Sequence, residues 1–221
     1  MNENVKLILS KIEKCPHKGN VHDFLSDLFE LSAIAISNNF IFSEEREKRY
    51  IATINKYDTR TQKLIIEIYA EIAHLLTNAD AFGFNDYLGE IYMASATSSN
   101  RAGQFFTPYH ISRACAELAV SQQFNNFINY HEMMKLKEPS CGAGGFVIAT
   151  ADALNQRGID YTKYLFASCS DIDKRCVNMA YVQLSLLGIP AIVKHGDSLT
   201  NEIWDTYETP AYILQHHNFT I

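Results

Sequence analysis

The second half of the sequence alternates short runs of strand length with longer runs at helical spacing. Strands are expected at 134–137, 164–169 and 191–194, with a fourth at 211–215. Between the first three lie helix-length runs, at 143–156 and 174–187, whose apolar residues recur three and four apart. This order predicts a parallel, doubly wound sheet, in which ligands bind at the carboxyl ends of the strands.

The first half of the sequence has few of the residues that interrupt helices. Of the 10 Gly and 5 Pro, only Gly19 and Pro16 come before residue 83. Asn20, Ser43 and Asn85 stand where helix N-caps are expected. Apolar residues recur at helical spacing, as in Phe24, Leu25, Leu28, Phe29 and Ala35, and again in Leu64, Ile65, Ile68, Tyr69, Ile72, Leu75 and Leu76. We therefore expect a helical N-terminal domain of four or five helices over residues 1–99, followed by an α/β domain over residues 100–221.

The charge balance is acidic, with 19 Lys plus Arg against 25 Asp plus Glu and a net charge of −6. This argues against a nucleic-acid-binding protein that relies on diffuse basicity, but it leaves open a local basic groove or DNA binding shared with another chain. Acidic residues interleave with the basic ones in the most basic segment, which contains Arg46, Lys48, Arg49, Lys56, Arg60 and Lys63. That pattern favours a solvated helix face over a DNA groove.

The five cysteines form no Cys-x-x-Cys pair, so neither a disulfide framework nor a zinc site is expected. No run of 18 apolar residues occurs, and the N-terminus carries an acid instead of an apolar leader core. We expect a cytoplasmic protein with no membrane segment and no bound metal.

A glycine-rich turn follows the first expected strand, in the segment Glu138-Pro-Ser-Cys-Gly142-Ala-Gly144-Gly-Phe. Such a turn between a strand and a helix lets a ligand approach the backbone closely. Val147 stands where a Gly-x-Gly-x-x-Gly dinucleotide fingerprint needs its third glycine, and no Gly-Lys-Ser/Thr follows, so nicotinamide and Walker-type phosphate binding are disfavoured. A tight turn that binds nothing is the alternative.

Acidic residues end the second and third expected strands. Asp171 is placed to accept the hydroxyls of a ribose, whereas Asp173 precedes a helical run and is expected to be its N-cap. At the third strand end, Asp197 could accept a hydrogen bond from an adenine amino group and Leu199 could cover the ring. On its own, the Gly196-Asp197 pair would suit a turn equally well.

Together with two upstream segments, these strand ends resemble those of N6-adenine DNA methyltransferases. The segments are Gly-Gln-Phe-Phe-Thr-Pro at 103–108 and Asp-Tyr-Leu-Gly-Glu-Ile-Tyr at 86–92. The chain is most similar to the modification subunits of type I restriction systems. The resemblance implies a Rossmann-like fold that depends on S-adenosylmethionine (AdoMet), preceded by a helical domain. It also implies methyl transfer to adenine N6 in DNA, with DNA bound through a complex and with a specificity or catalytic subunit as a partner.

The resemblance also implies roles for particular residues. Thr107 and the Phe105/Phe106 pair would hold the methionine part of AdoMet, with one of the two rings expected in the core. Asp171 would bind the ribose. The remaining cofactor-binding positions are Glu138 near the amino group, Gly142 and Gly144 beneath the ligand, Ile172 and Leu199 on the adenine faces, and Asp197 at the adenine amine.

The catalytic motif of that family, Asn/Asp-Pro-Pro-Tyr/Phe, has no counterpart, because the chain contains no Pro-Pro. If 211–215 is the fourth strand, the motif would fall on residues 216–219, where only Phe219 matches and His216 is a degenerate candidate. We therefore expect a C-terminally truncated version of the fold with an exposed sheet edge. Three hypotheses follow: a methyltransferase completed by another chain, a non-catalytic AdoMet-binding or DNA-interaction module, and a purely structural protein with an empty pocket.

Overall fold

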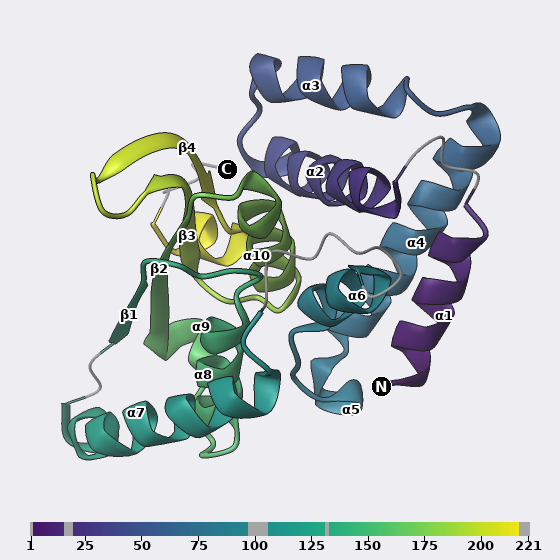
Figure 1. The fold of residues 1–221 in the computed structure, drawn as a ribbon. Helices are drawn as coiled ribbons and strands as arrows, with labels where there is room; N and C mark the ends of the chain where they lie inside the picture. The colour runs from purple at the N-terminus through teal and green to yellow at the C-terminus, as the bar shows by residue number, and fades with distance from the viewer. Residues whose placement is uncertain (1, 16–19, 97–105, 131–132, 217–221) are drawn as a thin grey trace.

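The computed structural model describes residues 2–15, 20–96, 106–130 and 133–216. Figure 1 shows a helical part, built from the first half of the chain, beside a small sheet with its own helices. Six helices form the first part: α1 (Glu3–Glu13), α2 (Val21–Phe40), α3 (Glu44–Ile54), α4 (Thr59–Thr77), the short α5 (Ala79–Phe82) and α6 (Tyr87–Ala96). Asn20 and Ser43 cap α2 and α3 as predicted. The prediction for Asn85 was wrong, because the Asp86 side chain accepts the Gly89 N–H at the start of α6.

The sheet contains β1 (Met134–Glu138), β2 (Leu165–Asp171), β3 (Ala191–Asp197) and β4 (Glu202–Glu208), in that spatial order. The first three strands run parallel, as predicted, and are joined by helices at the predicted places. Those helices are α8 (Gly145–Asn155) and α10 (Lys174–Leu186), with the short α9 (Tyr161–Tyr164) before β2 and the long α7 (Tyr109–Tyr130) packed against α8.

The prediction of a fourth strand at 211–215 was wrong, because this segment is the helix α11 (Pro210–His216). Thr209 starts it: its hydroxyl accepts the Ala191 N–H (2.9 Å) and its carbonyl accepts the Ile213 N–H (3.0 Å). Pro210 follows in the first turn, where proline is well tolerated. The fourth strand is the more polar segment β4, which runs antiparallel to β3 after a turn in which Asn201 adopts a φ of 60°. The sheet is therefore mixed, and not parallel throughout.

The sheet is also not doubly wound within the described residues, because α8 and α10 lie on the same face. Right-handed crossovers that step in one direction, from β1 to β2 to β3, place both helices on one side. The burial of β2 alternates accordingly, with Leu165, Ala167 and Cys169 buried against the helices and the residues between them half-buried on the other face.

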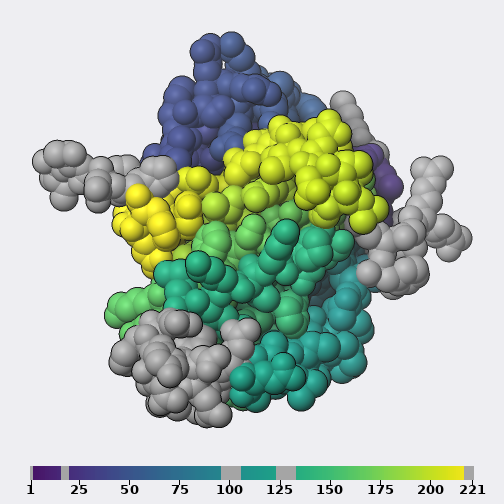
Figure 2. Space-filling model, turned by 90° about the vertical axis from the view of Figure 1, so that its left-hand side faces the viewer, coloured from purple at the N-terminus to yellow at the C-terminus, as the bar shows by residue number. Residues whose placement is uncertain are grey.

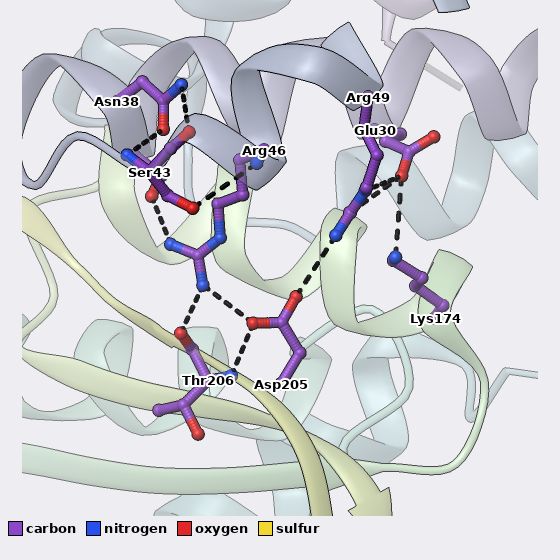
Figure 3. Close-up of polar contacts among 9 residues, drawn as sticks. Glu30, Asn38, Ser43, Arg46, Arg49, Lys174, Asp205 and Thr206 are labelled. Atoms are coloured by element: carbon purple, nitrogen blue, oxygen red, sulfur yellow. Dashed lines mark hydrogen bonds and ion pairs between the residues drawn. The ribbon is translucent and has the colours of Figure 1, made fainter. Parts of the chain in front are cut away.

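A cluster of ion pairs joins the helical part to the sheet (Figure 3). The Arg46 guanidinium contacts the Asp205 carboxylate (2.8 Å), the Thr206 carbonyl (2.6 Å) and the face of the Tyr207 ring (4.0 Å to the centroid). Arg49 pairs with Glu30 (2.8 Å) and lies 3.6 Å from Asp205. The prediction of a solvated basic face was therefore wrong for Arg46 and Arg49, which hold α3 against β4.

The apolar core is continuous across the two parts. Helix α2 packs on α10, and one cluster of buried side chains extends from Val5 in α1 to Tyr207 in β4. The helical residues predicted to be apolar contacts, such as Phe24 and Ile68, are buried in it. Among the described residues, no helix combines the length and the apolar composition needed to span a bilayer.

Candidate functional site

The glycine-rich turn is bound tightly to the neighbouring strand. The Cys141 N–H donates to the Ser170 carbonyl (2.9 Å), and the Gly142 N–H donates to the Asp171 carboxylate (2.9 Å). Gly142 has a φ of 53°, and a Cβ there would come within 3.1 Å of the Phe106 ring. The turn therefore requires glycine at 142, both for its backbone conformation and for the close approach of Phe106.

A pocket of about 170 Å³ opens beside this turn. It brings together four of the residues that the sequence resemblance predicts at the cofactor: Phe106, Thr107, Glu138 and Gly142. Phe106 is half-buried and packs edge-on against Tyr92, with ring centroids 5.8 Å apart, while Thr107 is exposed at the rim. Phe105 lies outside the described residues. The chain thus places segments 30 residues apart on two sides of one pocket.

The pocket is acidic. Its described lining residues include Asp86 and Glu138 but no Lys, Arg or His. Burial, and to a lesser extent the charge of Asp171, raises the pKa of the half-buried Glu138 carboxyl above its ordinary value. Burial also raises the pKa of Asp86. Two carboxyl groups without a neighbouring cation make this a place where a positively charged ligand would be stabilised.

Asp171 lies at the end of β2 and is almost fully buried. One carboxylate oxygen accepts the Gly142 N–H and the other accepts the Asp173 N–H, both at 2.9 Å. The side chain therefore fixes the turn after β1 relative to the turn after β2. Each oxygen keeps a lone pair for a further donor, such as a hydroxyl.

The other predicted adenine-binding residues lie on the surface at the same edge of the sheet. Ile172 is 63% exposed and Leu199 is 94% exposed, which is unusual for apolar side chains of this size. Asp197, at the end of β3, accepts the Leu199 N–H (2.8 Å) and so shapes the turn that presents Leu199. The Ser198 hydroxyl donates to the Pro139 carbonyl, which joins this turn to the one after β1.

Two further predicted residues have structural surroundings. Asp173 caps α10 by accepting the Arg175 N–H (2.9 Å), as predicted. Gly144 has a φ of 93°, and a Cβ there would contact Ala180 of α10, so it permits the close packing of α8 on α10. Gly144 does not line the described pocket.

Asp86 is the first residue of the segment 86–92, and the sequence predicted no role for it. In the structure its carboxylate accepts the Gly89 N–H (2.9 Å) and the Gln183 amide (2.8 Å), and it lines the pocket. Gln183 in α10 also donates to the Ala143 carbonyl (2.8 Å) and accepts the Leu88 N–H (3.0 Å). This pair joins α6, the glycine turn and α10. Gln183 lies between Val182 and Leu184 in the sequence, and this polar residue among buried apolar neighbours was the available signal.

The degenerate catalytic candidates do not reach this site. His216 is exposed near the end of α11, where its Nδ1 lies 3.0 Å from the Tyr212 carbonyl. Because β4 is antiparallel, α11 begins beside Ala191 at the amino end of β3, and the pocket lies at the opposite, carboxyl edge. Phe219 lies outside the described residues. The structure thus offers no catalytic group from this segment within the part of the chain that it describes.

Known proteins resemble this chain in structure and in sequence. A crystal structure from Listeria monocytogenes, assigned as a class I S-adenosylmethionine-dependent methyltransferase, is similar over 82% of this chain, with 17% sequence identity and a TM-score of 0.44. The match spans 55% of that protein's length. No curated protein matches the chain. The sequence model of the N-6 DNA methylase family matches residues 80–220, which include the pocket and the whole sheet. The chain belongs to the N-6 DNA methylase family.

Proposed function

We propose that this protein binds AdoMet at the carboxyl edge of the sheet and takes part in methylating adenine N6 in DNA. The family implies AdoMet as the cofactor, and the observation that carries the proposal is the acidic pocket beside the glycine turn. AdoMet has a sulfonium and an ammonium group, and Asp86 and Glu138 provide negative charge with no base among the described lining residues. The lining residues therefore fit this cofactor.

When bound, AdoMet supplies the methyl group, and the residues of this chain hold it. The Glu138 carboxylate would accept hydrogen bonds from the ammonium group, and the Phe106 ring would face the cationic end. Asp171 would use its remaining lone pairs for the ribose hydroxyls. Asp197 would accept from the adenine amine, and the exposed Ile172 and Leu199 would cover the ring.

The chemical step needs groups that position the target amine for attack on the methyl. The chain has no Pro-Pro, and His216 lies at the opposite edge of the sheet. We infer that methyl transfer depends on a catalytic segment outside the described residues, such as one on a partner subunit. The same two observations favour a second function, that of a non-catalytic AdoMet-binding module that assembles with DNA-modifying partners.

Calorimetric titration with AdoMet, S-adenosylhomocysteine and ATP tests the pocket. AdoMet should bind with micromolar affinity and S-adenosylhomocysteine more weakly, because the latter has no sulfonium charge. ATP shares the adenosine but carries a polyanion in place of the cationic amino acid, so the acidic pocket should reject it. A protein that binds ATP as well as AdoMet, or that binds neither, contradicts the assignment.

Transfer of tritiated methyl groups to DNA separates the two functions. Incorporation that appears only when a candidate partner is added supports the methyltransferase. AdoMet binding without incorporation under any condition supports the binding module.

A further inference from the structure

The face of the sheet opposite α8 and α10 is only partly covered: Tyr212 of α11 packs on Phe166 at one end, and polar residues lie toward the carboxyl ends of the strands. Strands buried on both faces are apolar throughout, whereas β1 alternates apolar and polar residues and the later parts of β2 and β3 place polar residues on the face away from α8 and α10. Lys135, Lys137, Ser168, Ser170 and Lys194 point away from the helices. Figure 2 shows this side of the molecule, with the teal and green of the sheet at the surface between the yellow-green β4 and α7. We call these five residues the lysine face.

The lysine face concentrates basic groups that have no ion pair. Most described Lys and Arg side chains pair with an acid, as Arg46 and Arg49 do. Six described basic residues have none, and three of them belong to the lysine face: Lys14, Arg60, Lys63, Lys135, Lys137 and Lys194. In a chain with a net charge of −6, such a local excess of positive charge favours an anionic partner.

The basic and hydroxyl groups of the lysine face surround a hollow. Lys137 pairs in register with Ser168, and Ser170 pairs with Lys194, so two hydroxyls lie between two ammonium groups. These four residues line a pocket of about 130 Å³. From β1 to β3 the face is about 10 Å wide. Asp197 and Glu202 also line this pocket.

A column of three rings, one pair tilted and one pair stacked, extends the lysine face at its other end. Phe166 is the register partner of Lys135, and its ring contacts Tyr212 of α11 (centroids 5.4 Å apart). His216 stacks on Tyr212 at 4.3 Å with an angle of 19° between the rings. His216 is exposed, so the outer end of this column can take another flat ring.

We propose that the lysine face and its ring column bind single-stranded DNA. Ammonium and hydroxyl groups suit phosphates, and an exposed ring next to them suits an unpaired base, which is the combination used by proteins that bind single strands. A duplex keeps its bases stacked inside and would make no use of the rings. The proposal rests on the proposed function for its choice of DNA, and it adds a second contact surface that adjoins the proposed adenine end of the AdoMet site at Asp197.

Protection of a sheet edge is the competing explanation for lysines on β1, because charged side chains discourage edge-to-edge pairing. That explanation covers Lys135 and Lys137. It does not cover Lys194, because β3 is paired on both sides, with β2 and β4. It also gives no reason for the ring column.

Fluorescence anisotropy with a labelled single-stranded oligodeoxynucleotide tests the proposal, with the matching duplex as a second probe. The single strand should bind more tightly than the duplex. The double variant Lys137→Ala/Lys194→Ala should lower its affinity at least tenfold, and the slope of log affinity against log salt should fall by about 0.7 per lysine. Arg60→Ala/Lys63→Ala removes the same charge from α4, where neither side chain has an ion pair, and should change the affinity less than twofold.

His216→Ala supplies an independent variant on the surface of α11. It should weaken single-strand binding by about fivefold or more, as expected for a lost stacking ring, and leave the weaker duplex binding unchanged. Equal losses of affinity in Lys137→Ala/Lys194→Ala and in the Arg60→Ala/Lys63→Ala control would overturn the proposal. Tighter binding of the duplex, or no binding of either probe, would also overturn it. AdoMet titration of the same preparations shows separately whether the proposed cofactor pocket is intact.

Discussion

The carboxyl edge and the open face of the same sheet treat charge in opposite ways. At the edge, Asp86, Glu138 and Asp171 are buried or half-buried, and no base is among the described residues that line the pocket of Asp86 and Glu138. On the open face, Lys137 and Lys194 lie among hydroxyls without an ion pair in the described chain. Under our proposals, the edge holds the cationic end of AdoMet closely, and the face holds an extended anion loosely.

This difference shows how a protein with an excess of acid can still have a surface for a polyanion. The buried carboxylates at the carboxyl edge are few, and backbone N–H groups orient them, as those of Gly142 and Asp173 orient Asp171. Charges on a face are mobile, screened and additive. Substitutions at the edge should therefore have large and specific effects, and those on the face smaller effects that depend on salt.

Asp171→Ala should have the largest effect. It removes the acceptor of two backbone N–H groups, at a cost of about 1–3 kcal/mol for each donor that becomes unsatisfied, and it should weaken AdoMet binding at least about 10-fold. Urea denaturation and calorimetry measure the two quantities. Asp171→Asn keeps one acceptor oxygen, so its loss in free energy of unfolding should be roughly half of the loss caused by Asp171→Ala. An Asp171→Ala variant with unchanged AdoMet affinity would remove this residue from the site.

Glu138→Gln should weaken AdoMet binding by about 10-fold, because a neutral amide replaces a charge-assisted partner. The pKa of Glu138 is raised above its ordinary value of 4.5, so the wild-type affinity should fall as pH is lowered through that raised pKa. Calorimetry between pH 7 and pH 5 should show this decline in the wild type and a flat profile in the variant. The matched control is Glu202→Gln, because Glu202 is exposed and does not line the proposed AdoMet pocket. Parallel profiles for wild type and Glu138→Gln would refute the role of this carboxyl.

Arg46→Ala should destabilise the fold by about 1–2 kcal/mol, because it breaks a half-buried, hydrogen-bonded ion pair with Asp205. Burial opposes ionisation of Asp205, but the hydrogen bond and charge of Arg46 outweigh it and lower its pKa below 3.8. A lowered carboxyl pKa adds stability above the unfolded-state value that is lost as pH falls through the folded-state value. The difference between wild type and variant should therefore be full at pH 7 and shrink below about pH 4.

Urea denaturation at several pH values measures that difference. Arg60→Ala, at an exposed position on α4, should cost less than about 0.5 kcal/mol. Neither binding surface includes Arg46, so the folded Arg46→Ala variant should bind AdoMet and DNA as the wild type does. A selective loss of one ligand would show that α3 contributes to that surface.

Asp197→Ala should have the smallest effect, with AdoMet affinity reduced by about 1 kcal/mol. The side chain is partly exposed and its main contact is the Leu199 N–H. Calorimetry against the Asp171 variants ranks the two acids. If Asp197→Ala costs more than Asp171→Ala, the adenine end of the site contributes more to AdoMet affinity than the ribose end does, against the predicted ranking.

Residue spacing within short segments predicted the elements whose formation depends on neighbouring residues. The three parallel strands and their helices were confirmed, because apolar alternation and helical spacing record burial directly, and the Asp173 cap needs only adjacent residues. The segment 211–215 misled because Ala-Tyr-Ile-Leu suits a buried strand, whereas Thr209 and Pro210 initiate a helix there. The choice depended on Thr209 bonding to Ala191, which is a tertiary contact.

The lysine face could not be predicted for a related reason. Its lysines are 59 residues apart in the sequence at most and come together only through strand register. In the basic segment that the sequence did indicate, Arg46 and Arg49 form ion pairs with Asp205 and Glu30. Clustering along the sequence was a poor guide to clustering in space.

The most direct test of two separate surfaces is a crossed titration. Glu138→Gln and Lys137→Ala/Lys194→Ala are each titrated with AdoMet and with the single-stranded oligodeoxynucleotide. We predict that Glu138→Gln loses AdoMet affinity and keeps the oligonucleotide within about twofold, and that the lysine variant does the reverse. If either variant loses both ligands equally, or if neither variant loses either ligand, the sheet does not carry two independent sites of opposite charge.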